Sequence, residues 1–172
     1  GAVAFVVDAE DTGAVEVKDT ASYTQEFSGT RFRERGETTV EKYGATAYER
    51  DAYTTVVSEA FEGIDAHDAV LAPTAPDADL PYRAGTTADA EVYENTSSLG
   101  DTGAVSALFS LLEAWKNGEE NVVVVGYGDG ASADAVRLVG SLPVEWERDA
   151  EDISHTEYLR RRGHVVGEGG DA

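Results

Sequence analysis

The chain of 172 residues contains no cysteine, and only three of its 13 basic residues are lysine. The absence of cysteine excludes disulfides and thiolate metal ligands within this chain. The basic residues are too few to form a face that neutralises phosphates, so we expect no nucleic-acid partner. No apolar run approaches the roughly 18 residues that a membrane-spanning helix requires, so we expect no membrane segment.

Methionine is also absent, and the first residue is a glycine. Residues 1–7 have the composition of a core strand and not that of a cleaved leader. We therefore expect this chain to be part of a longer protein. Its length is enough for one domain with a hydrophobic core.

Basic charge is outweighed by 34 acidic residues, which give a formal net charge of −21. The acids are spread evenly along a chain that is 41% hydrophobic, unlike those of a disordered acidic tail. Such a composition is typical of proteins adapted to high cytoplasmic salt, where carboxylates keep the surface hydrated and salt screens their repulsion. We therefore expect a cytoplasmic protein of a halophile.

Hydrophobic periodicity predicts an α/β domain with a mixed five-stranded sheet and helices on both faces. Helices are expected over residues 45–62 and 102–115, the second capped by Asp101 or Thr102. A charged segment, 29–42, has no clear period and is expected to be an exposed loop. Strands are expected over residues 1–7, 13–26, 68–73, 121–127 and 133–142.

The helix over residues 102–115 has apolar side chains around its whole circumference, in "GAVSALFSLLEAW". A sheet covers one side of a helix, so the other side needs a second layer. We expect that layer to come from another polypeptide, since an exposed apolar surface of this size recruits a partner.

Two further features are weak candidates for a site. The histidines His67, His155 and His164 are scattered, without the spacing of metal ligands, so we expect no metal. The turn "GYGDG" at 126–130 is followed by a strand, and it therefore lacks the helix N-terminus by which glycine loops bind phosphate. Composition alone favours a tight antiparallel hairpin between the last two strands.

Several motifs, spread over nearly the whole chain, carry a family resemblance. "LGDTGAVSALFSLLEAW" is similar to the Gly-Asn-Thr turn and buried central helix of the thiolase fold. "VVVVGYGDGASADAVRL" is similar to its glycine-rich hairpin, and "ISHTEYLRRRG" to a segment that follows the fold. "GAVAFVV" resembles the strand that closes the first half of that fold, and "SYTQEF" stands where the second half opens. The chain most resembles the second half of archaeal 3-hydroxy-3-methylglutaryl-CoA synthases.

This resemblance divides the chain into the last strand of a first half (1–8), a thiolase-like second half (9–146) and an extension (147–172). It implies an acyl-CoA substrate and no cofactor. In the family the glycine hairpin approaches the catalytic cysteine, and its backbone N–H groups hold the thioester oxygen. Gly128 and Gly130 match that hairpin; Ser132 departs from its pattern and is carried over as a substrate-binding position. Glycine is expected there because a Cβ would block the approach of substrate.

The catalytic positions of the family are replaced in this chain. Its nucleophilic cysteine belongs to the first half, and its second-half histidine aligns with Thr74, which is no base near neutral pH. The asparagine of the His-Gln-Pro-Asn motif aligns with Asp77. The asparagine of the Gly-Asn-Thr turn aligns with Asp101, whose ionised carboxylate accepts hydrogen bonds but donates none.

Three interpretations follow from these replacements. The chain is half of a diverged protein that binds acyl-CoA without condensing it, or half of an active CoA-dependent acyltransferase whose nucleophile lies in the other half. The third is a structural subunit, since archaeal relatives assemble with thiolase-fold and OB-fold subunits. Each interpretation expects a partner: the missing first half, or a second copy that replaces it in a dimer.

Overall fold

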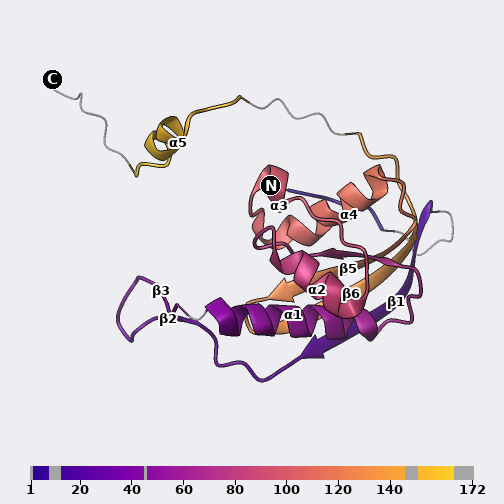
Figure 1. Cartoon of the computed structure of the whole chain (residues 1–172), viewed down its shortest axis with the longest axis horizontal. Coiled ribbons are helices and arrows are strands. Elements are labelled where there is room, and N and C mark those ends of the chain that lie inside the picture. The colour runs from indigo at the N-terminus through magenta and orange to yellow at the C-terminus, as the bar shows by residue number, and fades with distance from the viewer. Residues whose placement is uncertain (1, 8–12, 45, 146–150, 165–172) are drawn as a thin grey trace.

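The computed structural model describes residues 2–7, 13–44, 46–145 and 151–164. Within these residues, four strands form one mixed sheet in the order β1-β6-β5-β4 (Figure 1). The predicted α/β class with a mixed sheet is confirmed. The strands are β1 (Val15–Thr24), β4 (Val70–Pro73), β5 (Asn121–Gly128) and β6 (Ser132–Gly140).

The predicted hairpin at the end of the sheet is confirmed. Strands β5 and β6 pair antiparallel from Asn121 opposite Val139 to Gly128 opposite Ser132. Strand β4 runs parallel to β5, and β1 runs antiparallel to β6 at the sheet edge. The β-branched residues of β5 are buried on both faces, as is usual for a strand covered by helices on either side.

The prediction of a fifth strand is wrong for the described residues. Beside β4 the chain makes an isolated parallel bridge between Leu71 and Val92 and no regular strand. Two hydrogen bonds flank the bridge: Leu71 donates to Glu91, and Tyr93 donates to Leu71. Beyond the bridge, the Glu94 carboxylate accepts the N–H of Thr96, the first residue of helix α3 (Thr96–Leu99).

Residues 2–7 form no strand, which corrects the prediction of a core strand over 1–7. Val6 and Val7 are exposed, and the Phe5 ring meets that of Trp115 edge-on at 6.1 Å between centroids. A strand is stable only when a neighbour accepts its hydrogen bonds, and among the described residues no strand pairs with residues 2–7.

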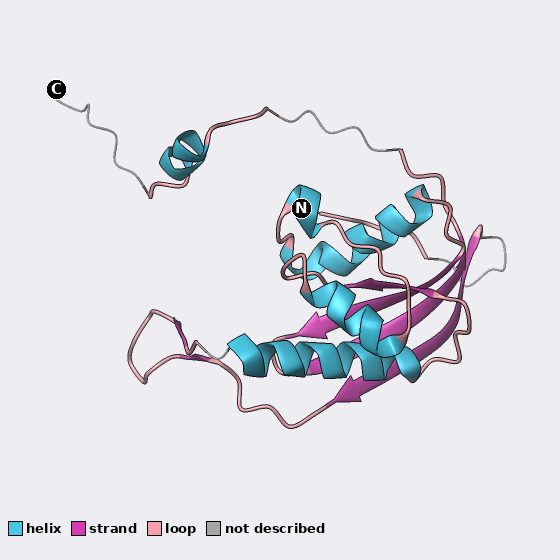
Figure 2. Cartoon of the chain, viewed as in Figure 1, coloured by secondary structure: helices cyan, strands magenta, loops and turns pink. Residues whose placement is uncertain are grey.

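Helices cover both faces of the sheet, as predicted (Figure 2). On one face lie α1 (Thr46–Glu62) and α2 (Leu80–Ala88), over a core that includes Val56, Val57, Leu71 and Val123. On the other face the 3₁₀ turn η1 (Gly103–Val105) leads into α4 (Ser106–Lys116).

Helix α4 is buried on one side only within this chain. Ala107, Leu111 and Ala114 are buried against the sheet, whereas Leu108 and Leu112 are half-buried at its margin. One-sided burial within this chain agrees with the expectation that its own sheet covers only one side of this helix. The expectation that another polypeptide covers the outer side stays a prediction.

Two segments extend beyond the sheet and its helices. Residues 29–42, expected to be a loop, contain the two-residue strands β2 (Arg31–Phe32) and β3 (Glu41–Lys42). Helix α5 (His155–Arg161) lies in the segment that resembles the one following the thiolase fold and has no buried residue. The predicted boundaries at residues 8 and 147 lie outside the described residues. No helix in the described ranges is long and apolar enough to cross a membrane.

Candidate functional site

A cavity of about 1030 Å³ opens where β4 and β5 end and β6 begins. The first turns of α1 and α2 form its other walls. Four residues singled out from the sequence line it: Thr74, Asp101, Gly128 and Ser132. Gly130, in the turn between β5 and β6, does not line it. The structure thus brings together four positions that are up to 58 residues apart in the chain.

Hydrogen bonds to neighbouring residues fix both the side chain and the carbonyl of Thr74. Its hydroxyl donates to the Val125 carbonyl at 3.4 Å and accepts the N–H of Tyr127 at 3.0 Å. Its carbonyl accepts a hydrogen bond from the hydroxyl of Tyr53 on α1. The Thr74 side chain therefore closes the parallel β4–β5 pair and leaves no basic group at this position.

Helix α4 positions the same segment from the opposite side. The Ser110 hydroxyl donates to the Pro73 carbonyl at 2.9 Å, and the Ser106 hydroxyl accepts the N–H of Ala75 at 2.8 Å. Both serines are buried, which makes these hydrogen bonds costly to lose. These hydrogen bonds explain why α4, an otherwise apolar helix, has two serines on its buried side.

The predicted N-cap at Asp101 or Thr102 is wrong for α4, which begins at Ser106 after Val105 and has no side-chain cap; Asp101 lies in the turn before it. Its carboxylate accepts the N–H of Gly103 at 2.7 Å, and Thr102 makes no such bond. Gly100 precedes it with φ 74° and ψ −177°, a conformation that is essentially restricted to glycine. This aspartate is therefore a hydrogen-bond acceptor within the chain, on the wall of the cavity.

The glycines of the hairpin are not required by contacts within this chain. A Cβ on Gly128 would lie 3.6 Å from the Ser132 hydroxyl oxygen, an ordinary contact, and one on Gly130 would meet nothing within 4 Å. The left-handed residue of the turn is Ala131, with φ 53°. Any need for glycine at 128 must come from a ligand approaching the backbone, which remains a prediction.

Six carboxylates and three guanidiniums line the cavity. The chain's own donors engage five of the carboxylates. Asp77 accepts two N–H groups at the start of α2, and Asp129 pairs with Arg31 at 3.1 Å. The remaining three are Glu49, bound by the Thr30 hydroxyl, Asp101, bound by Gly103, and Asp134, bound by Ser22.

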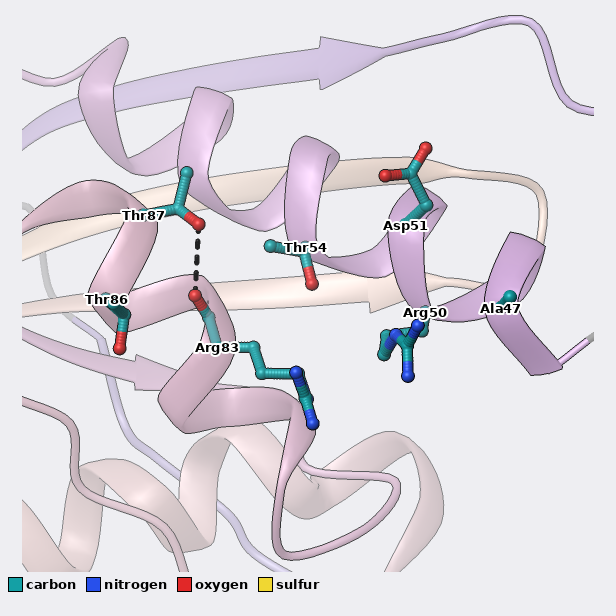
Figure 3. Close-up of a pocket in the computed structure, with 7 residues that line it drawn as sticks. All are labelled: Ala47, Arg50, Asp51, Thr54, Arg83, Thr86 and Thr87. Carbon is teal, nitrogen blue, oxygen red and sulfur yellow. Dashed lines mark hydrogen bonds between the residues drawn. The ribbon is translucent and has the colours of Figure 1, made fainter.

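The other two guanidiniums belong to Arg50 on α1 and Arg83 on α2. Within the described part of the chain, neither guanidinium has an ion pair or hydrogen bond. Both also line a smaller hollow of about 410 Å³ between the two helices, where the Arg83 side chain extends toward the end of α1 that bears Arg50 (Figure 3). These two free donors make the site able to hold an anion.

Sequence reasoning missed both arginines. Each stands alone on the exposed side of a short helical pattern, where a single charged residue is ordinary. The signal was their rarity: the chain has 13 basic residues against 34 acidic ones. Only the packing of α1 on α2 shows that the two share one cavity.

Two tyrosines, Tyr53 and Tyr127, also line the cavity. Tyr53 is buried and meets Tyr127 edge-on, with 4.9 Å between ring centroids. Burial, and secondarily the charge of Asp77, raises the pKa of the Tyr53 phenol far above its ordinary value. Burial followed by the charge of Asp129 raises the pKa of Tyr127. Both phenols are therefore neutral donors in the physiological range and are not bases.

The histidines do not contribute to this site. His67, His155 and His164 are all exposed and do not line the cavity. Among the described residues there is no group of three or more histidine, cysteine or acidic side chains placed to hold a metal ion.

No family model and no curated protein matches this sequence. Solved structures, however, match its fold. The chain is similar to 3-oxoacyl-(acyl carrier protein) synthase III from Pseudomonas aeruginosa PAO1, with 19% identity and a TM-score of 0.61 over 81% of this chain and 48% of that one. The corresponding enzyme from Aquifex aeolicus VF5 has 16% identity and a TM-score of 0.52, over 76% of this chain and 46% of its own.

The chain has a thiolase-like fold. It spans about half the length of the two synthases it resembles. The predicted fold family is thereby confirmed, while identities this low say nothing of substrate. In the thiolase-like chain, the cavity lies where β4, the β5–β6 hairpin and the turn before α4 converge.

Proposed function

We propose that this chain is part of a thiolase-like protein that binds an acyl-CoA and has lost the condensation reaction. The observation that carries the proposal is the cavity itself, which combines the glycine hairpin with two unpaired guanidiniums. The finer assignment, to relatives of hydroxymethylglutaryl-CoA synthase, rests on the sequence motifs of the hairpin and of the turn before α4. We propose no cofactor.

The anionic part of the ligand is assigned to Arg50 and Arg83. A guanidinium forms paired, charge-assisted hydrogen bonds with phosphate oxygens, and coenzyme A carries several phosphates. Five of the six carboxylates in the cavity are engaged within the chain, so they do not compete for these two arginines. The acyl end would then reach Gly128 and Ser132, where the absence of a Cβ at 128 leaves the backbone open.

Loss of condensation follows from the residues at the catalytic positions. The Thr74 hydroxyl is engaged by Val125 and Tyr127, so it is neither a base nor a free donor. An ionised Asp101 beside a developing oxyanion would repel the charge that the family's amide stabilises.

A partner subunit is part of this proposal. The half-buried Leu108 and Leu112 on the outer side of α4 favour cover by another polypeptide, for which we propose the missing first half. Further thiolase-fold or OB-fold subunits would suit a protein with a structural role. An active acyltransferase, whose nucleophile comes from that other half, is the outcome that would replace our proposal.

Binding of acetyl-CoA by isothermal titration calorimetry tests the proposal. We expect Arg83→Gln and Arg50→Gln each to weaken binding about tenfold, the equivalent of roughly 1.4 kcal/mol. Arg160→Gln on α5 makes the same charge change at an exposed position outside the cavity and is expected to leave the affinity unchanged. Equal affinities in all four proteins would overturn the assignment of the site.

A turnover assay separates the proposal from its alternative. This chain together with the other half is mixed with acetyl-CoA and acetoacetyl-CoA, and release of free CoA is measured. We expect no turnover. Turnover that Thr74→Ala abolishes would instead identify an active acyltransferase, with Thr74 in its machinery.

The salt-adapted, cytoplasmic character read from the composition is also a proposal. The cavity has three more carboxylates than guanidiniums, which repels a polyanion at low salt. Screening this repulsion should make acyl-CoA binding stronger as KCl rises. Binding that weakens as KCl rises would instead indicate that attraction to the arginines outweighs repulsion by the carboxylates. The sign of the salt dependence therefore shows which of the two effects dominates.

A further inference from the structure

The smaller hollow between α1 and α2, of about 410 Å³, adjoins the larger cavity, because Arg50 and Arg83 line both (Figure 3). Besides one alanine, its lining consists of polar side chains whose spacing of three and four residues places them on one face of each helix. An acyl chain would cover these polar groups without bonding them, so the hollow suits a polar ligand. The polar residues are Arg50, Asp51 and Thr54 of α1 and Arg83, Thr86 and Thr87 of α2.

Three side chains of the hollow have hydrogen-bond donors that the chain itself does not use. Within the described residues, the guanidiniums of Arg50 and Arg83 and the hydroxyl of Thr54 have no hydrogen bond or ion pair. The hydroxyls of Thr86 and Thr87 differ, since they donate to backbone carbonyls within α2 at 2.8 and 3.1 Å. Figure 3 shows the Thr54 hydroxyl pointing toward the side of the hollow on which the two arginine side chains lie. The three groups can therefore donate to one anion.

The hollow is net positive, and both of its guanidiniums are unpaired. Asp51 is the acidic residue among those that line it, and Figure 3 shows the Asp51 carboxylate turned away from both arginines. In a chain with 34 acidic against 13 basic residues, two arginines without an ion pair favour a role in binding an external anion. Two guanidiniums that share one hollow repel each other, and a bound anion relieves that repulsion.

A terminal phosphate monoester matches this arrangement. It carries a charge of about −1.5 to −2 at neutral pH and three acceptor oxygens, so that two guanidiniums and a hydroxyl can each bind one oxygen. A phosphate within a diester or an anhydride carries less charge and has fewer free oxygens. Coenzyme A has a single phosphate monoester, on the 3′-hydroxyl of its ribose, at the end remote from the thioester.

We propose that Arg50, Arg83 and Thr54 form a subsite for this phosphate monoester, so that the protein selects acyl-CoA by its 3′-phosphate. The inference rests on the proposed binding of acyl-CoA and adds the group that is recognised. The thioester end then extends into the larger cavity, which the same two arginines line. A ligand that lacks the 3′-phosphate leaves these donors without a partner.

Isothermal titration calorimetry with acetyl-CoA and acetyl-3′-dephospho-CoA, at one fixed KCl concentration, tests the proposal. We expect the wild type to bind acetyl-CoA at least about tenfold more tightly, because the dephospho compound loses hydrogen bonds to charged groups. Arg83→Gln and Thr54→Val should each reduce this affinity ratio by about threefold or more. The control, Thr55→Val, makes the same change at the next residue, which is also half-buried but lines neither the hollow nor the cavity, and should leave the ratio unchanged.

The outcomes separate this inference from the proposed function. Equal affinities of the wild type for the two compounds, or a ratio that neither Arg83→Gln nor Thr54→Val changes, would overturn the inference and leave acyl-CoA binding intact. Failure of the wild type to bind acetyl-CoA would overturn both. Binding of inorganic phosphate without acetyl-CoA binding, weakened in Arg83→Gln, would identify a site for free phosphate instead. Circular dichroism shows whether each variant is folded, and if one is not, the other decides.

Discussion

The last glycines of β5 and β6, Gly128 and Gly140, are expected to respond differently to a single added methyl group. Gly140 has φ 102°, and a Cβ built there would lie 2.1 Å from the carbonyl oxygen of Ala14. Gly128 has no such constraint, and its Cβ would make ordinary contacts with Ser132. We therefore expect Gly140→Ala to impair folding and Gly128→Ala to impair ligand binding.

The cost at position 140 follows from two independent terms. A non-glycine residue in this backbone conformation costs about 1–3 kcal/mol. Overpacking against a backbone atom costs about 1–3 kcal/mol more, and relief is limited because the Gly140 N–H is bonded to Glu120 at 2.7 Å and β1 begins opposite it. A total of about 3 kcal/mol lowers the melting temperature by roughly 6–12 °C in a domain of this size.

Urea unfolding followed by the fluorescence of the buried Trp115 measures this cost, with circular dichroism as a second probe. The free energy of unfolding of Gly128→Ala is expected to stay within about 0.5 kcal/mol of the wild type. Calorimetry should then show weaker acetyl-CoA binding by Gly128→Ala, since a Cβ there blocks the backbone.

Two outcomes would refute this reasoning. If Gly140→Ala unfolds at the same urea concentration as the wild type, the close approach between the end of β6 and Ala14 does not exist. If Gly128→Ala is as stable as the wild type and binds acetyl-CoA equally well, the glycine hairpin does not meet the ligand.

Three further predictions concern stability. The melting temperature should fall as KCl is lowered from molar to physiological concentration, because the Debye length grows from about 3 Å to about 8 Å; a melting temperature indifferent to KCl would count against salt adaptation. Burial raises the pKa of Tyr53, so its stabilising contribution is complete below about pH 10 and is lost as pH rises further. Stability should therefore fall less steeply above pH 10 in Tyr53→Phe than in the wild type, and identical slopes would contradict this. Gly85→Ala should destabilise α2 despite its better helix propensity, since the Cβ would lie 2.1 Å from a Val92 methyl, and adding Val92→Ala should recover part of the loss.

Local patterns in the sequence predicted the elements whose backbone hydrogen bonds join residues close together in the sequence. The helix predicted over 45–62 is α1, and the hairpin predicted over 121–142 is β5 and β6. Helical hydrogen bonds join residues four apart, and a hairpin pairs residues adjacent to one turn, so spacing within a short window decides both. The motif resemblance added the fold family, which the solved structures confirm.

Tertiary structure decided the features that depend on residues distant in the sequence. The apolar run at 2–7 has no partner strand in the part of the chain that the structure describes, and Val92 reaches β4 for a single bridge, so neither became a regular strand. Arg50 and Arg83 share a cavity because α1 packs on α2, a contact that no local window contains. Burial, strand pairing and the charge balance of a site depend on residues that are far apart in the sequence. Local sequence patterns therefore do not predict them.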